Sequence, residues 1–119
     1  MHNSKLGNAF EQKFTQYLSS LGYWVTFLQR DRTGAQPFDF IASKNNSPLV
    51  GDCKTCKKDY ISIDRLQINQ ISSFEKWLAC KNSKCIIAVE HNAEIYIVDY
   101  TELKEKKKVY LTNNYKVGV

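Results

Sequence analysis

Apolar residues recur at three- and four-residue steps from residue 6 to residue 21, which predicts an amphipathic helix. Gly22 follows at once and predicts the end of that helix, because glycine enters the left-handed conformation without a steric penalty. Residues 64–80 show the same periodicity, with Asp64 as the expected N-cap. The chain is therefore predicted to contain one helix near its start and another beyond its middle.

Five other runs are rich in aromatic and β-branched residues, which is typical of strands. They cover residues 23–28, 37–42, 48–56, 84–90 and 94–100, and a short helix followed by an edge strand is expected over residues 101–111. Turn-forming residues separate the second run from the third and the fourth from the fifth. The order α-β-β-β-α-β-β predicts an α/β fold with a central mixed β-sheet flanked by helices, in a single domain of residues 1–119.

Acidic residues interrupt two of the predicted strands. Asp39 lies in the second strand, and Asp52 and Lys54 lie two residues apart in the third. Because side chains alternate along a strand, Asp52 and Lys54 project to the same face and Cys53 to the other. Buried charges must be paired or must bind an ion, and carboxylate oxygens are ligands that Mg²⁺ and Mn²⁺ prefer. The pattern indicates a divalent metal site, and the alternative is a salt-bridged pair of edge strands.

The balance of charge favours a polyanionic partner. The 119 residues carry a formal net charge of +5 at pH 7. The cations closest in sequence to the acidic residues are Arg30, Arg32, Lys54, Lys57, Lys58 and Arg65. Cations on both sides of an acidic site are what a surface that contacts backbone phosphates needs. The lysine-rich run at residues 104–108 is expected to be a solvated face instead.

Several classes of protein are disfavoured by what the sequence lacks. No apolar run is long enough to span a bilayer, and residues 1–8 lack the apolar core of a signal peptide, so a cytoplasmic protein without membrane association is expected. The chain has two histidines, His2 and His91, which are too few for a typical histidine-based nuclease or zinc hydrolase. No glycine-rich phosphate loop of the Walker type occurs, so ATP-driven chemistry is not expected.

Four cysteines leave two interpretations open. Cys53 and Cys56 have the spacing of zinc ligands, and Cys80 and Cys85 could complete a tetrahedral site. Against zinc, no glycine lies between the first pair to form the tight turn of a zinc knuckle, and Cys53 and Cys85 lie in apolar runs. Buried free thiols in a reducing cytoplasm are therefore the favoured interpretation.

The order of the acidic motifs resembles that of the PD-(D/E)xK nuclease superfamily. Residues 37–39, Pro-Phe-Asp, precede residues 52–54, Asp-Cys-Lys, with aspartate where the family often has glutamate. The segment GNAFEQKF is similar to the family's opening helix, and Glu11 matches a glutamate that contacts the metal. Within the superfamily the chain is most similar to small Holliday junction resolvases of the archaeal Hjc type and the bacterial RecU type. Gln70, in the segment INQISSF, matches a glutamine in the helix that follows their second acidic motif.

This resemblance implies a restriction-endonuclease-like core and a Mg²⁺-dependent endonuclease in which Mn²⁺ can substitute. The metal ligands that it implies are Glu11, Asp39, Asp52 and the backbone carbonyl of Cys53. Lys54 would orient or help to deprotonate the attacking water, and Gln70 would position that water or a phosphate oxygen. From spacing alone, Glu11 could equally be a surface residue of its helix, and Gln70 could bond to core backbone.

The expected substrate is branched DNA, in particular a four-way junction cut by a homodimer whose two sites make symmetric cuts. The expected contacts to the DNA backbone are Arg30, Arg32, Thr33, Lys57 and Lys58. A phage, mobile-element or prokaryotic host origin would suit so short a nuclease. Two alternatives stay open. One is a restriction-like or repair nuclease with another DNA target, and the other is a non-catalytic module that binds nucleic acid or protein on the same fold.

Overall fold

The structure is a computed structural model, and it describes residues 9–28, 36–80 and 84–117. The helices are α1 (Ala9–Ser20), α2 (Ile68–Ala79) and α3 (Tyr100–Lys106), and a 3₁₀ turn, η2, covers Ile63–Arg65. The strands are β1 (Trp24–Phe27), β2 (Phe40–Lys44), β3 (Ser47–Thr55), β4 (Tyr60–Ser62), β5 (Lys84–His91), β6 (Glu94–Asp99), β7 (Lys108–Tyr110) and β8 (Lys116–Val117). The predicted α/β order is confirmed, and the structure adds β4, η2 and β8 to it.

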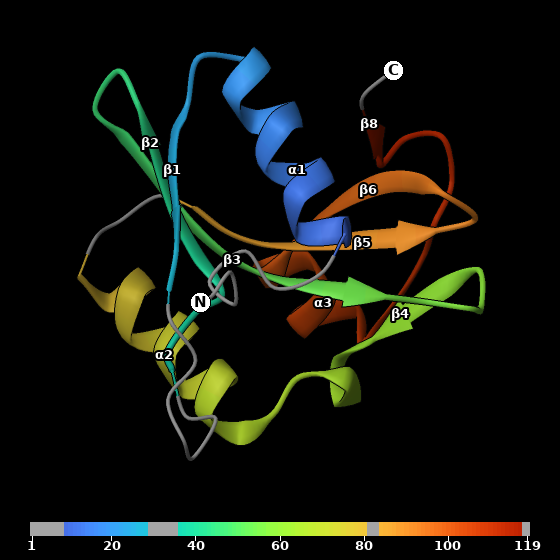
Figure 1. The fold of residues 1–119 in the computed structure, drawn as a ribbon. Helices are drawn as coiled ribbons and strands as arrows, with labels where there is room; N and C mark the ends of the chain where they lie inside the picture. The colour runs from blue at the N-terminus through green and yellow to red at the C-terminus, as the bar shows by residue number, and fades with distance from the viewer. Residues whose placement is uncertain (1–8, 29–35, 81–83, 118–119) are drawn as a thin grey trace.

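A six-stranded sheet forms the centre of the fold, in the order β1-β2-β3-β5-β6-β8 (Figure 1). The β3 and β5 strands run parallel, whereas the other neighbours in this sheet are antiparallel. The connection from β3 to β5 contains α2, as a parallel pair requires a long crossover. The β4 and β7 strands pair with each other in a separate two-stranded sheet. The central sheet is therefore mixed, as the sequence predicts.

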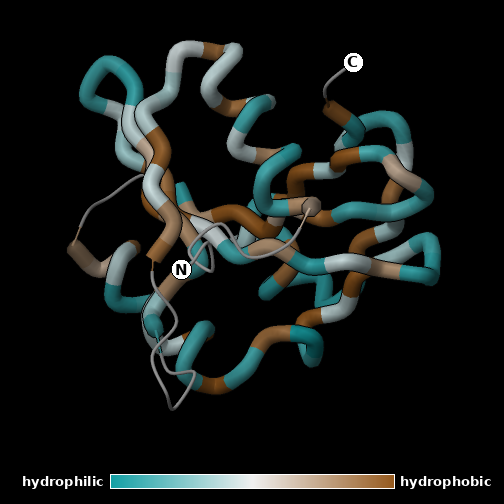
Figure 2. Tube along the Cα trace, viewed as in Figure 1, coloured by the Kyte–Doolittle hydropathy of each residue, from teal (hydrophilic) through white to brown (hydrophobic). Residues whose placement is uncertain are grey.

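The two faces of the central sheet carry separate hydrophobic clusters. Successive β5 side chains point to opposite faces, so Ile86 joins a cluster with Phe14 of α1, and Ile87 joins a cluster with Phe74 of α2 and Tyr100 of α3. Figure 2 shows hydrophobic residues concentrated along the central strands and hydrophilic residues at the turns. The α1 helix thus covers one face of the sheet, and α2 and α3 cover the other.

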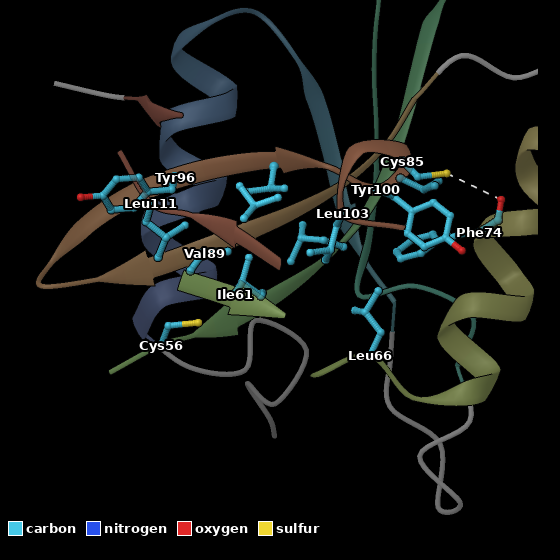
Figure 3. Packing of buried hydrophobic residues seen from close by; sticks show 14 of the residues in the cluster. Cys56, Ile61, Leu66, Phe74, Cys85, Val89, Tyr96, Tyr100, Leu103 and Leu111 are labelled. Atoms are coloured by element: carbon cyan, nitrogen blue, oxygen red, sulfur yellow. Dashed lines mark hydrogen bonds between the residues drawn. The ribbon is translucent and has the colours of Figure 1, made fainter. Parts of the chain in front are cut away.

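The larger cluster fixes α2 and α3 against the sheet. Phe74 is fully buried, and its ring centroid lies 4.9 Å from that of Tyr100. Figure 3 shows these rings beside Cys85, whose thiol lies 3.8 Å from the Phe74 carbonyl oxygen. Aromatic pairs at such separations add to the stability gained from burial of their area. The start of α2, where Gln70 lies, is consequently held in a fixed position against the sheet.

The predicted turns are confirmed where the structure describes them. Gly22 has φ of +94° and ends α1, in the left-handed region that favours glycine. Asn45 and Asn46 have φ of 52° and 64°, and they connect β2 to β3 in a two-residue hairpin. The hairpin fixes the register of β2 against β3 and so decides which residues of the two strands lie opposite one another.

One predicted boundary is wrong. Asp64 was expected to cap a helix over residues 64–80, but it lies in η2, and α2 begins at Ile68 with Gln67 as its N-cap. The Asp64 carboxylate accepts a hydrogen bond from the Ser62 hydroxyl instead, and this local contact favours a turn over the first turn of a helix. Residues 37–39 also lie just before β2 rather than inside it. In the described residues, no helix is long and apolar enough to cross a membrane.

Candidate active site

Asp39 and Asp52 are brought together by the pairing of β2 with β3. Phe40 pairs with Gly51 at the end of this antiparallel ladder, so Asp39, directly before β2, lies beside the segment of β3 that contains Asp52. The regular ladder ends there, because the Asp39 amide donates to the Gly51 carbonyl oxygen at 2.9 Å, one residue out of the Phe40–Gly51 register. The Cys53 amide in turn donates to Asp39 Oδ2 at 2.8 Å. The backbone of β3 therefore holds one carboxylate beside the other.

Gly51 allows the close packing that surrounds these acids. A Cβ atom at this position would lie 2.6 Å from the Ile86 carbonyl oxygen and 2.7 Å from the Phe40 ring. Real Cβ atoms do not approach that closely, and the Ile86 oxygen belongs to the backbone and has no room to move aside. Glycine is therefore required immediately before Asp52 if β3 is to lie between Phe40 and β5.

Asp52 lies at the centre of the site. The residue is 1% exposed, and its Oδ1 accepts a hydrogen bond from Gln70 Nε2 at 2.9 Å. Its Oδ2 lies 2.8 Å from Lys54 Nζ. Apart from this ion pair, the buried Oδ2 has no hydrogen-bond partner among the described residues, so it keeps acceptor capacity. The sequence prediction that Asp52 and Lys54 share a face is confirmed by this contact.

Gln70 links α2 to the site through both ends of its amide. Its Nε2 donates to Asp52, and its Oε1 accepts from the Gln67 amide at 2.8 Å. Because Gln67 is the N-cap of α2, the same side chain caps the helix and orients the carboxylate. The alternative that Gln70 bonds only to backbone does not account for its contact with the Asp52 carboxylate.

The pKa of Asp52 is raised from 3.8 to about 7. Burial is the largest cause, because desolvation disfavours the charged form, and the hydrogen bond and negative charge of Asp39 add to it. Lys54 acts in the opposite direction and lowers the pKa of Asp52. Without another cation, a neutral solution would leave the Asp52 carboxyl about half protonated.

This raised pKa predicts that the metal-free protein loses stability as the pH rises. The native state binds more protons than the unfolded state between the unfolded pKa near 3.8 and the folded pKa near 7, so the free energy of unfolding falls across that window. The full effect is up to about 4 kcal/mol. We expect Asp52→Asn, which has no carboxyl to titrate, to lack this contribution. Urea unfolding in EDTA from pH 5 to pH 8 measures it, and equal slopes for both proteins would contradict the prediction.

The residues present fit a divalent cation of the oxygen-binding type. Two carboxylates converge in a buried position, and the raised pKa of Asp52 shows that burial and Asp39 together outweigh the positive charge of Lys54 there. The acceptor capacity of Asp52 Oδ2 is consistent with a ligand that an incoming cation could use. In the described residues, no group of three or more His, Cys, Asp or Glu side chains is close enough to hold a metal. Water and substrate oxygens would have to supply the other ligands, as is usual for Mg²⁺.

The other predicted metal ligands are less closely gathered. Glu11 is 3% exposed and lies on α1, which covers β1 and β3 from the face opposite to α2. Its burial does not fit the alternative of a surface residue in an amphipathic helix. The structure does not join it with the two aspartates in one ligand cluster. The metal contacts of Glu11 and of the Cys53 carbonyl stay predictions.

The predicted DNA contacts fall in two places. Arg30, Arg32 and Thr33 lie outside the described residues. Lys57 and Lys58 are exposed and line a hollow that begins at Thr55, the residue after Lys54. The structure therefore places these two lysines on the surface immediately beyond the C-terminal end of β3.

The four cysteines are free thiols in separate environments. Cys56 and Cys85 are buried, Cys53 is partly buried, and Cys80 is exposed at the end of α2. Burial raises the pKa of the Cys85 thiol to about 12, so that thiol stays protonated at neutral pH. These positions agree with the interpretation as free thiols.

Comparisons with known proteins agree with this geometry. The family model described as "Archaeal holliday junction resolvase (hjc)" matches residues 2–118. The crossover junction endodeoxyribonuclease Hjc of Methanocaldococcus jannaschii is 24% identical over 110 residues, which cover 92% of this chain and 77% of that protein. The crystal structure of Hjc from Archaeoglobus fulgidus, a Holliday junction resolvase, superposes with a TM-score of 0.66 at 14% identity, covering 87% of this chain and 85% of the other. The structural likeness establishes the fold.

Proposed function

Because this chain belongs to the archaeal Hjc family of Holliday junction resolvases, we propose that the Asp39–Asp52 pair is the centre at which it cuts branched DNA with the aid of Mg²⁺. Membership makes the chain a branched-DNA endonuclease and implies a divalent metal. The choice of Mg²⁺, with Mn²⁺ as a substitute, and the roles of individual residues are proposals. The observation that carries them is the convergence of Asp39, Asp52, Lys54 and Gln70 at one buried point.

Asp39 and Asp52 would hold the cation, with the Cys53 carbonyl and Glu11 as further ligands, directly or through water. A bound divalent cation supplies Lewis-acid charge at the scissile phosphate. The Cys53 amide fixes the Asp39 carboxylate, and Gln70 fixes that of Asp52, so neither carboxylate must reorganise when the ligand arrives. Preorganised charge of this kind lowers the barrier without a cost at the moment of reaction.

Lys54 is the proposed catalytic amine. Its Nζ lies 2.8 Å from Asp52 Oδ2, and its side chain is 17% exposed, so part of it stays accessible to solvent beside the buried carboxylate. The ammonium group would orient the attacking water and offset the negative charge that develops on the phosphate oxygens. Gln70 is a positioning residue, because its contact is to the Asp52 carboxylate.

We further propose that the protein acts as a homodimer. A four-way junction is resolved by two symmetric cuts, and each described chain offers one pair of converged aspartates. A twofold dimer places two such centres in the symmetric relation that the junction needs. Titration of the junction should then reach saturation at two chains per junction.

Selective binding of the four-way junction tests this substrate assignment. Replacing both Arg30 and Arg32 by alanine should weaken junction binding more than replacing Lys104 and Lys106. Both of those lysines are solvent-exposed and paired with Glu75 and Glu102, which makes them a matched control. The wild-type preference for junction over linear duplex of equal length should persist as salt rises, whereas simple polycation binding falls steeply for every DNA.

Fluorescence anisotropy with junction and duplex in parallel measures both effects. Equal losses on the two DNAs in the arginine variant would mean that the segment supplies charge without selecting DNA structure. A wild-type preference that disappears with salt would contradict recognition of the junction itself.

A further inference from the structure

A hollow of about 500 Å³ lies beyond the C-terminal end of β3 and is lined by basic side chains. Its cations are Lys57, Lys58 and Arg65. Asp64 adds a carboxylate, which accepts a hydrogen bond from the Ser62 hydroxyl. The hollow is bounded by the end of β3 on one side and by β4 and η2 on the other. It is distinct from the aspartate pair, which is buried within the sheet.

Arg65 is held in a fixed position whose charge is not neutralised by its partners. Its Nη2 donates to the Thr55 carbonyl oxygen at 3.1 Å, and its Nη1 lies 3.3 Å from Cys56 Sγ. Neither partner is a carboxylate, and in the part of the chain that the structure describes Arg65 forms no ion pair. The planar guanidinium, oriented in this way, keeps its remaining N–H groups for an anion such as a phosphate, two of whose oxygens can accept in a bidentate contact.

Two lysines gather beside the hollow on an aromatic side chain. The Tyr60 ring centroid lies 4.4 Å from Lys108 Nζ and 5.6 Å from Lys58 Nζ. Tyr110, which is 54% exposed, lies against the same ring at 5.6 Å between centroids. Cation–π attraction favours both ammonium groups at this ring, and within residues 9–28, 36–80 and 84–117 neither lysine forms an ion pair with a carboxylate. The pairing of β4 with β7 therefore builds a positive surface next to Arg65.

The hollow lies close to the proposed cutting point. Thr55, which anchors Arg65, immediately follows Lys54, and three residues of extended strand separate it from Asp52 by about 10 Å. A DNA strand rises about 3.4 Å per nucleotide along the helix axis, and its successive phosphates lie farther apart than that, so the strand spans this distance within about three nucleotides. A strand whose scissile phosphate sits at the aspartate pair can therefore reach Arg65 with one of its next few phosphates.

We propose that this hollow binds a second backbone phosphate of the cleaved strand, with Arg65 as the main contact and Lys57, Lys58 and Lys108 as supporting charges. The inference rests on the proposed function, because it takes branched DNA as the ligand. It assigns to Arg65 and to the β4–β7 pair a part in positioning the strand. A fixed second phosphate would set which bond of that strand reaches the aspartate pair.

Single neutral phosphates test this site directly. Four-way junctions are prepared with one methylphosphonate at each position within about four nucleotides of the crossover, a span set by the rise of the DNA strand. Their affinities are measured in Ca²⁺ for wild type, for Arg65→Ala and for Lys104→Ala, which removes an exposed, paired cation from α3. Arg65 is exposed, so its replacement should leave the fold intact. If Arg65→Ala unfolds at a lower temperature than wild type, Arg65→Gln is measured instead, because its side-chain amide retains a donor for the Thr55 carbonyl oxygen.

At one position, the neutral phosphate should weaken binding by wild type and by Lys104→Ala about tenfold, the usual effect of losing one charge-assisted hydrogen bond. The same substitution should weaken binding by the Arg65 variant clearly less than binding by wild type, because the main contact is already lost and only the supporting lysines remain. If the Arg65 variant loses as much as wild type at every position, or if no position matters in wild type, the inference is overturned. The readout is binding, so an absence of cleavage in Mg²⁺ would defeat the proposed function while the scan still decided whether Arg65 holds a phosphate.

Discussion

Asp52→Asn should abolish cleavage of a four-way junction, with a loss of about a thousandfold or more in the single-turnover rate. Asparagine keeps the shape of the side chain and can still accept the hydrogen bond from Gln70 Nε2. It removes the negative charge that a divalent cation needs. Because the position is 1% exposed, no anion from solvent can take the place of the lost carboxylate. Junction binding should stay within about threefold, because surface cations supply most phosphate contacts.

Glu105→Gln is a matched control for that variant. It removes one carboxylate from an exposed position on α3, and it should cut junctions at the wild-type rate. A thermal melt of Asp52→Asn at pH 7 should show no loss of stability, because the carboxylate it removes is costly to bury. Residual cleavage within tenfold of wild type would mean that Asp52 is not a metal ligand in the reaction.

Lys54→Ala should lower the single-turnover rate by about a hundredfold to ten-thousandfold, the range expected for loss of a positioned acid–base group. The variant keeps Asp39, Asp52 and Gln70, so a divalent cation should still bind. Because Lys54 lowers the pKa of Asp52, its removal should raise that pKa further and shift metal binding toward higher pH. Lys54→Arg should recover little activity, since the larger, planar guanidinium does not place its charge where the compact ammonium lies.

The control for Lys54→Ala is Lys104→Ala, which removes a cation of 53% side-chain exposure. Single-turnover rates on the junction at saturating protein separate a loss of chemistry from a loss of binding. If Lys54→Ala cuts within a few-fold of wild type, the ammonium group serves only to neutralise Asp52.

Local sequence patterns predicted the elements that carry the site. Alternation along a strand was enough to place Asp52 and Lys54 on one face, and the structure confirms this with a contact of 2.8 Å. The hairpin residues Asn45 and Asn46 then set the register that pairs Phe40 with Gly51 and so brings Asp39 close to Asp52. These features follow from neighbours in sequence, and for that reason the sequence alone could show them.

Features that depend on tertiary contacts were not predicted. The start of α2 was misplaced because Ser62 and Asp64 form a local turn and Gln67 with Gln70 forms the cap. The double contact of Gln70 requires α2 to lie against β3, which periodicity does not report. The β4 strand was missed because it is three residues long and its partner, β7, lies some 50 residues away in the sequence. The position of Arg65 depends on the same long-range packing.

The central claim is that the Asp39–Asp52 pair is a metal-dependent centre for cutting branched DNA. Single-turnover cleavage of an end-labelled four-way junction by the wild-type protein tests it most directly, in Mg²⁺, in Ca²⁺ and in EDTA. We expect symmetric cuts near the crossover in Mg²⁺, little cutting in Ca²⁺ and none in EDTA. Cleavage that is undiminished in EDTA would contradict the account.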